Sequence, residues 1–194
     1  MRLDMILYTD LMMKAKKAMT EQIFFDTDCI SSLLWTKQEN LILQLFPNRI
    51  IFPQDVWDEM SNPCIPHFLQ RLSKMRSLKV ISVMPILVKT EEFEIFHELA
   101  VAPASGRKLI GRGEAAAIAL AKVNKGVLAS NNLKDISCYL ELYNLKNITT
   151  SDILVLAMGE GLITETEGNI IWSDLIRRRQ KMPVSTFSDY IKFR

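Results

Sequence analysis

The sequence predicts an α/β fold in which helices cover both faces of a five-stranded parallel sheet. Five short, mostly apolar stretches have the length of strands, and segments with helical spacing of their apolar residues separate them. Residues 114–123 are mostly alanine, isoleucine and leucine, which is typical of a helix packed on most of its sides. Both observations favour a layered architecture. We expect strands at 23–26, 49–52, 77–83, 126–129 and 147–150.

Capping residues and helix breakers set the limits of the helices between these strands. Pro53 suits the first turn of a helix that Asn62-Pro63 ends, and Thr90 caps a later amphipathic helix. The glycines of 103–113 predict a loop, and Pro183 ends a basic helix near the C-terminus. Besides the helix that Thr90 caps, we expect helices at 28–36, 38–46, 54–61, 65–75, 114–123, 133–143, 151–158, 164–181 and 185–191.

The composition is that of one folded domain, or of one domain with an extension. Of the 194 residues, 48% are apolar, which is too many for a disordered protein and enough for a core. The formal net charge of +2 does not by itself indicate a nucleic-acid partner. Residues 171–194, however, hold six lysines and arginines against two acidic residues. This basic end could contact phosphate, although a solvated helix face explains it equally well.

The cysteines and histidines favour a reducing compartment and argue against a zinc site. The three cysteines are odd in number and far apart, so we expect buried thiols in the cytoplasm and no disulfides. With two histidines in the chain, a histidine-based metal site is not expected. The residues concerned are Cys29, Cys64, Cys138, His67 and His97.

The N-terminal segment does not have the pattern of a targeting signal. No apolar run reaches the length needed to span a membrane. Residues 1–22 lack the charged-then-apolar order of a signal peptide. We interpret them as an N-terminal extension, which is either a docking helix or sequence upstream of a start at Met19.

Acidic residues recur where the predicted strands end. Asp26 ends the first strand, and Glu59 closes the helix after the second. Glu114 begins the buried helix before the fourth strand, and Asp135 follows that strand. Because the carboxyl ends of parallel strands meet at one edge of the sheet, we expect these acids to converge there. Clustered carboxylates are hard ligands that suit Mg²⁺ or Mn²⁺, and such a site would serve metal-assisted hydrolysis of a phosphodiester.

Each of these positions also has an ordinary structural explanation. An acid in the first turn of a helix interacts favourably with the helix dipole, which covers Glu114 and Asp135. We expect Asp28 to be the N-cap of the helix after the first strand, and Ser151-Asp152 to cap a later helix. Four polar neighbours could support the acids and are equally suited to turns and caps: Thr27, Ser31, Asn131 and Asn132.

Four segments resemble, in order, the sequence blocks of the PIN-domain ribonucleases, the family that includes the VapC-type toxins. The opening Phe25-Asp26-Thr27-Asp28-Cys29-Ile30 resembles the first block, and residues 52–59 resemble the second. Residues 111–121, a Gly-Arg-Gly-Glu sequence followed by an alanine-rich run, are the most specific match. Residues 128–135 resemble the fourth block, but asparagines stand at 131 and 132, where many members have an aspartate.

The resemblance implies a PIN-like domain at 23–158 and a helical C-terminal extension at 159–194. It implies a Mg²⁺- or Mn²⁺-dependent endoribonuclease whose catalytic residues and metal ligands are Asp26, Glu59, Glu114 and Asp135. The chain could be the toxin of a toxin–antitoxin pair, so the expected partners are RNA, an antitoxin protein and a second copy in a homodimer. We expect contacts with RNA phosphate from Arg112, Lys134, Arg177, Arg178 and Arg179.

Two other functions stay open on the sequence. The asparagines of the fourth block also fit a PIN-like module that binds RNA or protein without cleaving it. In addition, Asp26-Thr27-Asp28 after a strand resembles the haloacid-dehalogenase phosphatases, with Asp26 as nucleophile and Asp28 as general acid. That family requires a pair of acids after a later strand, where this chain has Ser130-Asn131-Asn132.

Overall fold

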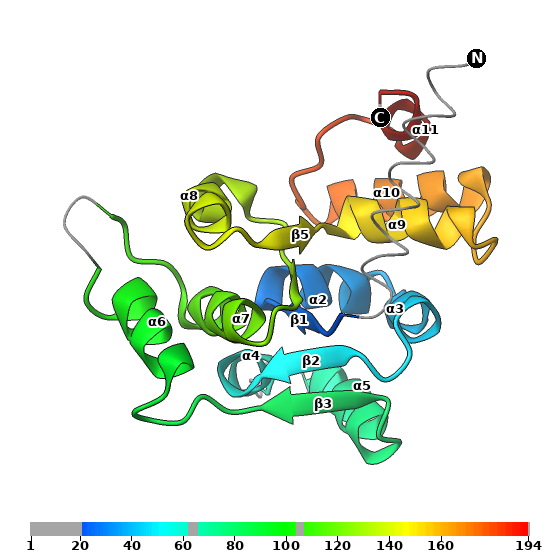
Figure 1. Ribbon diagram of the computed structural model, residues 1–194. Coiled ribbons are helices and arrows are strands. Elements are labelled where there is room, and N and C mark those ends of the chain that lie inside the picture. Colours follow the sequence, from blue (N-terminus) through cyan, green and yellow to red (C-terminus); the bar gives the residue numbers. More distant parts are fainter. Residues whose placement is uncertain (1–20, 62–65, 104–106, 194) are drawn as a thin grey trace.

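Five parallel strands form the centre of the fold, and helices pack on both faces of the sheet (Figure 1). The computed structural model describes residues 21–61, 66–103 and 107–193; the expected N-terminal extension and Cys64 lie outside these ranges. The α/β prediction with a five-stranded parallel sheet is confirmed. The strands are β1 (Ile23–Phe25), β2 (Ile50–Pro53), β3 (Ile81–Met84), β4 (Val127–Ala129) and β5 (Lys146–Ile148).

The helices occur where the sequence predicts them, with limits that differ by a few residues. They are α2 (Thr27–Trp35), α3 (Glu39–Leu45), α4 (Gln54–Met60), α5 (Pro66–Ser77), α6 (Glu91–Ala100), α7 (Arg112–Val123), α8 (Leu133–Tyr143), α9 (Thr150–Gly159), α10 (Glu165–Arg177) and α11 (Phe187–Lys192). Thr90 caps α6 as expected, by accepting a hydrogen bond from the backbone N–H of Phe93 at 3.3 Å. Asp152 takes part in capping α9 as expected, because its carboxylate completes a capping box in the first turn, but the N-cap itself is Thr149 and not Ser151.

The order of the strands reverses direction at the middle of the sheet. The spatial order is β3-β2-β1-β4-β5, so the chain moves outward from β1 to β3 and then returns to add β4 on the other side of β1. This reversal makes a topological switch point between β1 and β4, and open α/β sheets bind ligands at the carboxyl end of such a point. Asp26 and Ser130 directly follow the two strands.

The central strand separates two hydrophobic cores. Ile23 and Phe25 belong to the core that contains residues of α2, α3, α9 and α10, whereas Phe24 belongs to the core with α6, α7 and α8. All three side chains are fully buried, because neighbouring residues of a strand point to opposite faces and both faces are covered. The helix α7 is buried over residues 115–121, as its composition predicts.

The C-terminal helices share the first core with the sheet. Trp172 of α10 and Phe187 of α11 are fully buried in it. Gly168 is the reason that α11 can pack so closely, because a Cβ atom at this position would lie 2.3 Å from the Phe187 ring. The helix α10 continues unbroken through Gly168, which is a contact site within it.

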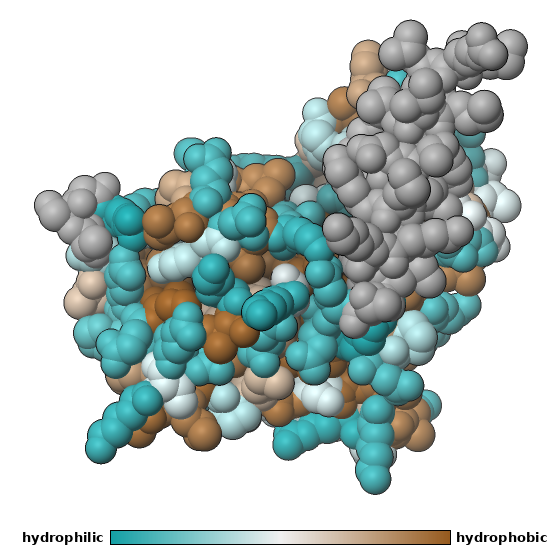
Figure 2. Space-filling model, viewed as in Figure 1, coloured by the Kyte–Doolittle hydropathy of each residue, from teal (hydrophilic) through white to brown (hydrophobic). Residues whose placement is uncertain are grey.

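The face shown in Figure 2 is largely polar, with apolar side chains gathered among polar ones over the α6–α8 region. Among the described helices, none is both long and apolar enough to cross a membrane. Cys29 is buried as expected, but the expectation of a buried thiol is wrong for Cys138, which is exposed because it lies on the outer face of α8.

The close packing at Gly168 predicts a destabilising substitution. We expect Gly168→Ala to lower the free energy of unfolding by about 1–3 kcal/mol, since the added methyl group overlaps the Phe187 ring. This loss should exceed the gain of about 1 kcal/mol that alanine normally brings to a helix. Urea denaturation measures the difference. In a Phe187→Ala background the same change should be neutral or stabilising, and an equal loss in both backgrounds would contradict the packing explanation.

Candidate functional site

Asp26 lies at the carboxyl end of the central strand and is fully buried. Its backbone is extended, and its Oδ1 accepts a hydrogen bond from the backbone N–H of Cys29 at 2.7 Å. Asp26 is therefore the N-cap of α2. The expectation that Asp28 is the cap is wrong, because the helix begins at Thr27, directly after the strand. The Oδ2 atom of Asp26 is also buried, and within the described part of the chain it has no hydrogen-bond partner.

Burial raises the pKa of Asp26 from 3.8 to about 7. The hydroxyl of Ser130 and the backbone N–H of Cys29 oppose this rise, whereas the negative charges of Asp28 and Glu114 add to it. Ser130 lies near enough to lower the pKa but makes no hydrogen bond of normal geometry with Oδ2. Glu114 is thus close enough to interact electrostatically with Asp26. A positive charge beside Oδ2 would favour the ionised carboxylate and lower this pKa.

Glu59 joins the beginnings of two helices. Its carboxylate accepts a hydrogen bond from the Thr27 hydroxyl in α2 and another, at 3.1 Å, from the backbone N–H of Gly113 in α7. A Cβ atom at position 113 would lie 2.8 Å from Thr27 Oγ1 and 3.0 Å from both carboxylate oxygens of Glu59, so a side chain there would displace this contact. This contact brings the first turn of α7, and with it Glu114, next to the start of α2.

Asn132 lies between Glu114 and Asp135. Its Nδ2 donates to Glu114 Oε1 at 2.7 Å and to Asp135 Oδ2 at 3.0 Å. The other Glu114 oxygen accepts a hydrogen bond from the backbone N–H of Gly111 at 3.4 Å, as the first-turn explanation predicts. Hydrogen bonds from Asn132 and Lys108 hold the pKa of Asp135 below its usual value. The asparagine amide therefore occupies the space that separates two of the predicted acids.

The remaining polar candidates have partners outside this group of acids. The Asn131 side chain donates to Thr150 Oγ1 at 2.9 Å and accepts from the Thr150 N–H at 2.8 Å, so it joins the end of β4 to the start of α9. The Ser31 hydroxyl donates to the backbone carbonyl of Asp28 at 3.1 Å, within its own helix. Asn131 therefore links two elements and Ser31 bonds to its own helix backbone, which are common structural roles for asparagine and serine.

The predicted phosphate-binding residues lie at the start of α7, in the first turn of α8 and at the C-terminal end of α10. Arg112 forms an ion pair with Asp55, at 2.8 Å, and its guanidinium lies 4.9 Å from the centre of the Phe96 ring. Lys134 is exposed in the first turn of α8. The three arginines at 177–179 are exposed at the C-terminal end of α10.

Two residues that the sequence did not single out also belong to the site. Ser130 is fully buried beside Asp26, and its position directly after β4 matches that of Asp26 after β1. Gln180 donates to the two carboxylate oxygens of Asp28, at 3.4 and 3.2 Å. The position of Ser130 directly after a predicted strand could have identified it from the sequence. The contact of Gln180 with Asp28 could not be predicted, because the two residues are far apart in the chain.

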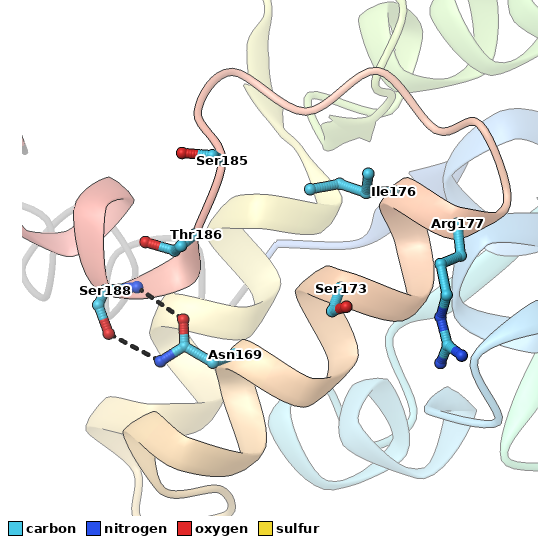
Figure 3. A pocket seen from close by; sticks show the side chains of 7 residues that line it. All are labelled: Asn169, Ser173, Ile176, Arg177, Ser185, Thr186 and Ser188. Atoms are coloured by element: carbon cyan, nitrogen blue, oxygen red, sulfur yellow. Dashed lines mark hydrogen bonds between the residues drawn. The ribbon is translucent and has the colours of Figure 1, made fainter.

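A separate hollow of about 690 Å³ lies between α10 and the segment that leads into α11 (Figure 3). Ser173 and Arg177 line it, and Asn169 and Ser188 close one end by exchanging two hydrogen bonds, at 2.7 and 3.1 Å. None of the acids near Asp26 lines this hollow, so we do not assign the candidate site to it.

The site suits a divalent cation in its donor atoms but is not a preformed cage. Asp26 Oδ2 is a buried carboxylate oxygen without a partner, and oxygen ligands of this kind suit Mg²⁺ or Mn²⁺. Within residues 21–61, 66–103 and 107–193, however, no three acidic, histidine or cysteine side chains converge as a metal site. Glu114 would have to exchange its hydrogen bond with Asn132 for a metal contact.

The comparisons with known proteins do not assign a family. No protein-family model matches the chain, and the search of curated proteins finds no match.

The raised pKa of Asp26 predicts a pH-dependent stability in metal-free buffer. Because folding raises this pKa from 3.8 to about 7, the contribution of Asp26 to stability is complete below pH 4 and is lost as the pH rises to about 7. Asp26→Asn removes the titration. We expect its free energy of unfolding, relative to the unchanged protein, to rise by about 4 kcal/mol between pH 4 and pH 8.

Urea denaturation at several pH values measures this difference. Asp58→Asn, at an exposed position five residues after the end of β2, is the matched control. Parallel pH curves for Asp26→Asn and the unchanged protein would contradict the raised pKa.

Proposed function

We propose that the chain is a Mg²⁺- or Mn²⁺-dependent ribonuclease of the PIN type. The observation that carries this proposal is the buried Asp26 carboxylate at the end of the central strand, with one oxygen unpartnered and the charge of Glu114 nearby. Leaving a buried carboxylate oxygen unpaired is costly, and a bound cation would remove that cost. The position at the switch point between β1 and β4 is also where open α/β sheets bind their ligands.

In this proposal Asp26 and Glu114 hold the cation, with Asp135 and Asn132 beside Glu114. The bound cation would supply an activated water and offset the charge that develops on the phosphodiester. Glu59 chiefly positions the other acids, because its hydrogen bonds with Thr27 and Gly113 hold together the two helix starts that carry Asp26 and Glu114. An ion pair with Asp55 holds Arg112 next to the same helix start, at the rim where a phosphate would approach.

The exposed basic residues and the free thiols support RNA as the substrate and the cytoplasm as the compartment. The exposed arginines at 177–179 suit a polyanion, and the free thiols of Cys29 and Cys138 suit a reducing compartment. The role as a toxin, the antitoxin partner and the homodimer stay predictions.

A PIN-like module that binds RNA without cleaving it is the second candidate. One observation favours it: the Asn132 amide holds Glu114 and Asp135 in place without a cation, by donating to both. If that bridge is permanent, Glu114 does not turn toward Asp26, and the acids have a purely structural role.

Cleavage and metal binding test the first proposal together. With Mn²⁺ at about 100 times its dissociation constant, the protein should gain about 2.7 kcal/mol in its free energy of unfolding. It should cleave a labelled single-stranded RNA, and EDTA should stop cleavage. Asp26→Asn should lose both the metal-induced gain and the cleavage, whereas Asp58→Asn, on an exposed carboxylate, should keep both. Full cleavage by Asp26→Asn would remove Asp26 from the site.

Asn132→Asp separates the two candidates. Without metal, a third carboxylate beside Glu114 and Asp135 should lower the free energy of unfolding by about 1–3 kcal/mol, because two hydrogen bonds are replaced by repulsion. With Mn²⁺, the added ligand should tighten binding about tenfold, or about 1.4 kcal/mol, measured by calorimetric titration. If the metal affinity of the variant equals that of the unchanged protein, the module without cleavage is the better description.

A further inference from the structure

Residues 177–184, here called the C-terminal strap, connect the end of α10 to the turn before α11 (Figure 1). The strap is fixed at three points. Gln180 donates to the Asp28 carboxylate, and the Arg178 guanidinium lies 5.3 Å from the centre of the Trp35 ring. Near its end, the carbonyl of Val184 accepts a hydrogen bond from Trp172 Nε1 at 3.0 Å. The strap therefore lies along α2, the helix that Asp26 caps.

The strap carries four positive charges and no negative one. Arg177 and Arg178 both pair with Asp174, at 3.0 and 3.4 Å. Arg179 and Lys181 are exposed, and neither forms an ion pair with another residue that the structure describes. The strap thus presents two uncompensated cations to solvent.

Gln180 determines where these two cations lie. It stands between Arg179 and Lys181 in the chain, and its side chain reaches Asp28, two residues after Asp26. Because an amide and not a cation engages the Asp28 carboxylate, the neighbouring positive charges are not neutralised by it. The apolar residues of the strap do not add a lipid-facing surface, since Met182 and Val184 pack against the core.

We infer that the C-terminal strap binds the phosphate backbone of single-stranded RNA beside Asp26, with Arg179 and Lys181 as the contacts and Gln180 as the positioning residue. A backbone that crosses the carboxyl end of β1 would then meet the strap on one side of the acids. The choice of RNA rests on the proposed function, but binding to the strap does not require cleavage.

Fluorescence anisotropy with a fluorescein-labelled 12-nucleotide oligouridylate in EDTA tests this inference. The variant Arg179→Gln/Lys181→Gln should bind about tenfold more weakly at 0.1 M salt. The slope of log affinity against log salt should fall by about 1.4, which is about 0.7 for each lost contact with a single strand. Circular dichroism and the thermal midpoint should not change, because both side chains are exposed.

Lys74→Gln/Lys79→Gln is the matched control. It removes two exposed positive charges that precede the edge strand β3, at the amino end of the sheet and not at the carboxyl end where Asp26 lies. Lys79 also matches Arg179 in backbone, since both have a positive φ, 57° and 63°. The control should keep the affinity within about twofold and the salt slope within about 0.3. An equal loss in both variants, or none in the strap variant, would overturn the inference.

Gln180→Ala tests the positioning role. It keeps every charge, so the salt slope should stay the same while the affinity falls about threefold, because the two cations are no longer held beside Asp28. An unchanged affinity would refute the role of Gln180. RNA that binds through the strap without being cleaved in Mn²⁺ would leave this inference standing and refute the ribonuclease. If the Arg179→Gln/Lys181→Gln variant binds RNA normally and still cleaves it, the inference about the strap is refuted and the proposed ribonuclease stands.

Discussion

The structure depends on one carboxylate that ends a strand and starts a helix. Asp26 follows β1, which pairs with β2 and β4, and its Oδ1 caps α2 through the N–H of Cys29. The same packing that buries Phe24 and Phe25 on the two faces of the sheet takes Asp26 out of water. Its second oxygen is left without a partner, and its pKa is raised to about 7. The fold thus holds a carboxyl group whose charged form is unfavourable until a cation, or another positive group, comes near.

The acids around Asp26 are arranged by contacts between helix starts. Gly113 lets α7 approach α2 closely enough for Glu59 to bridge Thr27 and the Gly113 N–H. Glu114 comes next in the chain and reaches Asn132. A carboxylate at Glu59 is therefore useful to the fold whether or not a metal binds, whereas the buried Oδ2 of Asp26 has no structural use that we can identify. This difference is why the functional proposal rests on Asp26.

Contacts made by the C-terminal helices also position residues beside the site. Gly168 admits the Phe187 ring, and Trp172 holds the Val184 carbonyl, so the segment between α10 and α11 is fixed in place. Gln180 then reaches Asp28 and brings basic residues to the side of α2. Core packing of the C-terminal helices thereby determines where the basic residues of the C-terminal strap lie on the surface.

The sequence by itself determined the local features of this protein. Apolar runs and helical spacing predicted the strands and helices, including α8 at residues 133–143, because an element that packs on the core repeats its apolar residues with the period of its secondary structure. The placement of acids after strands predicted which edge of the sheet to inspect. Tertiary structure alone decided that Asp26 and not Asp28 caps α2, that Cys138 is exposed, and that Asn132 separates Glu114 from Asp135. These outcomes depend on which helices meet in space, and a contact such as Gln180 with Asp28, 152 residues apart, has no counterpart in local spacing.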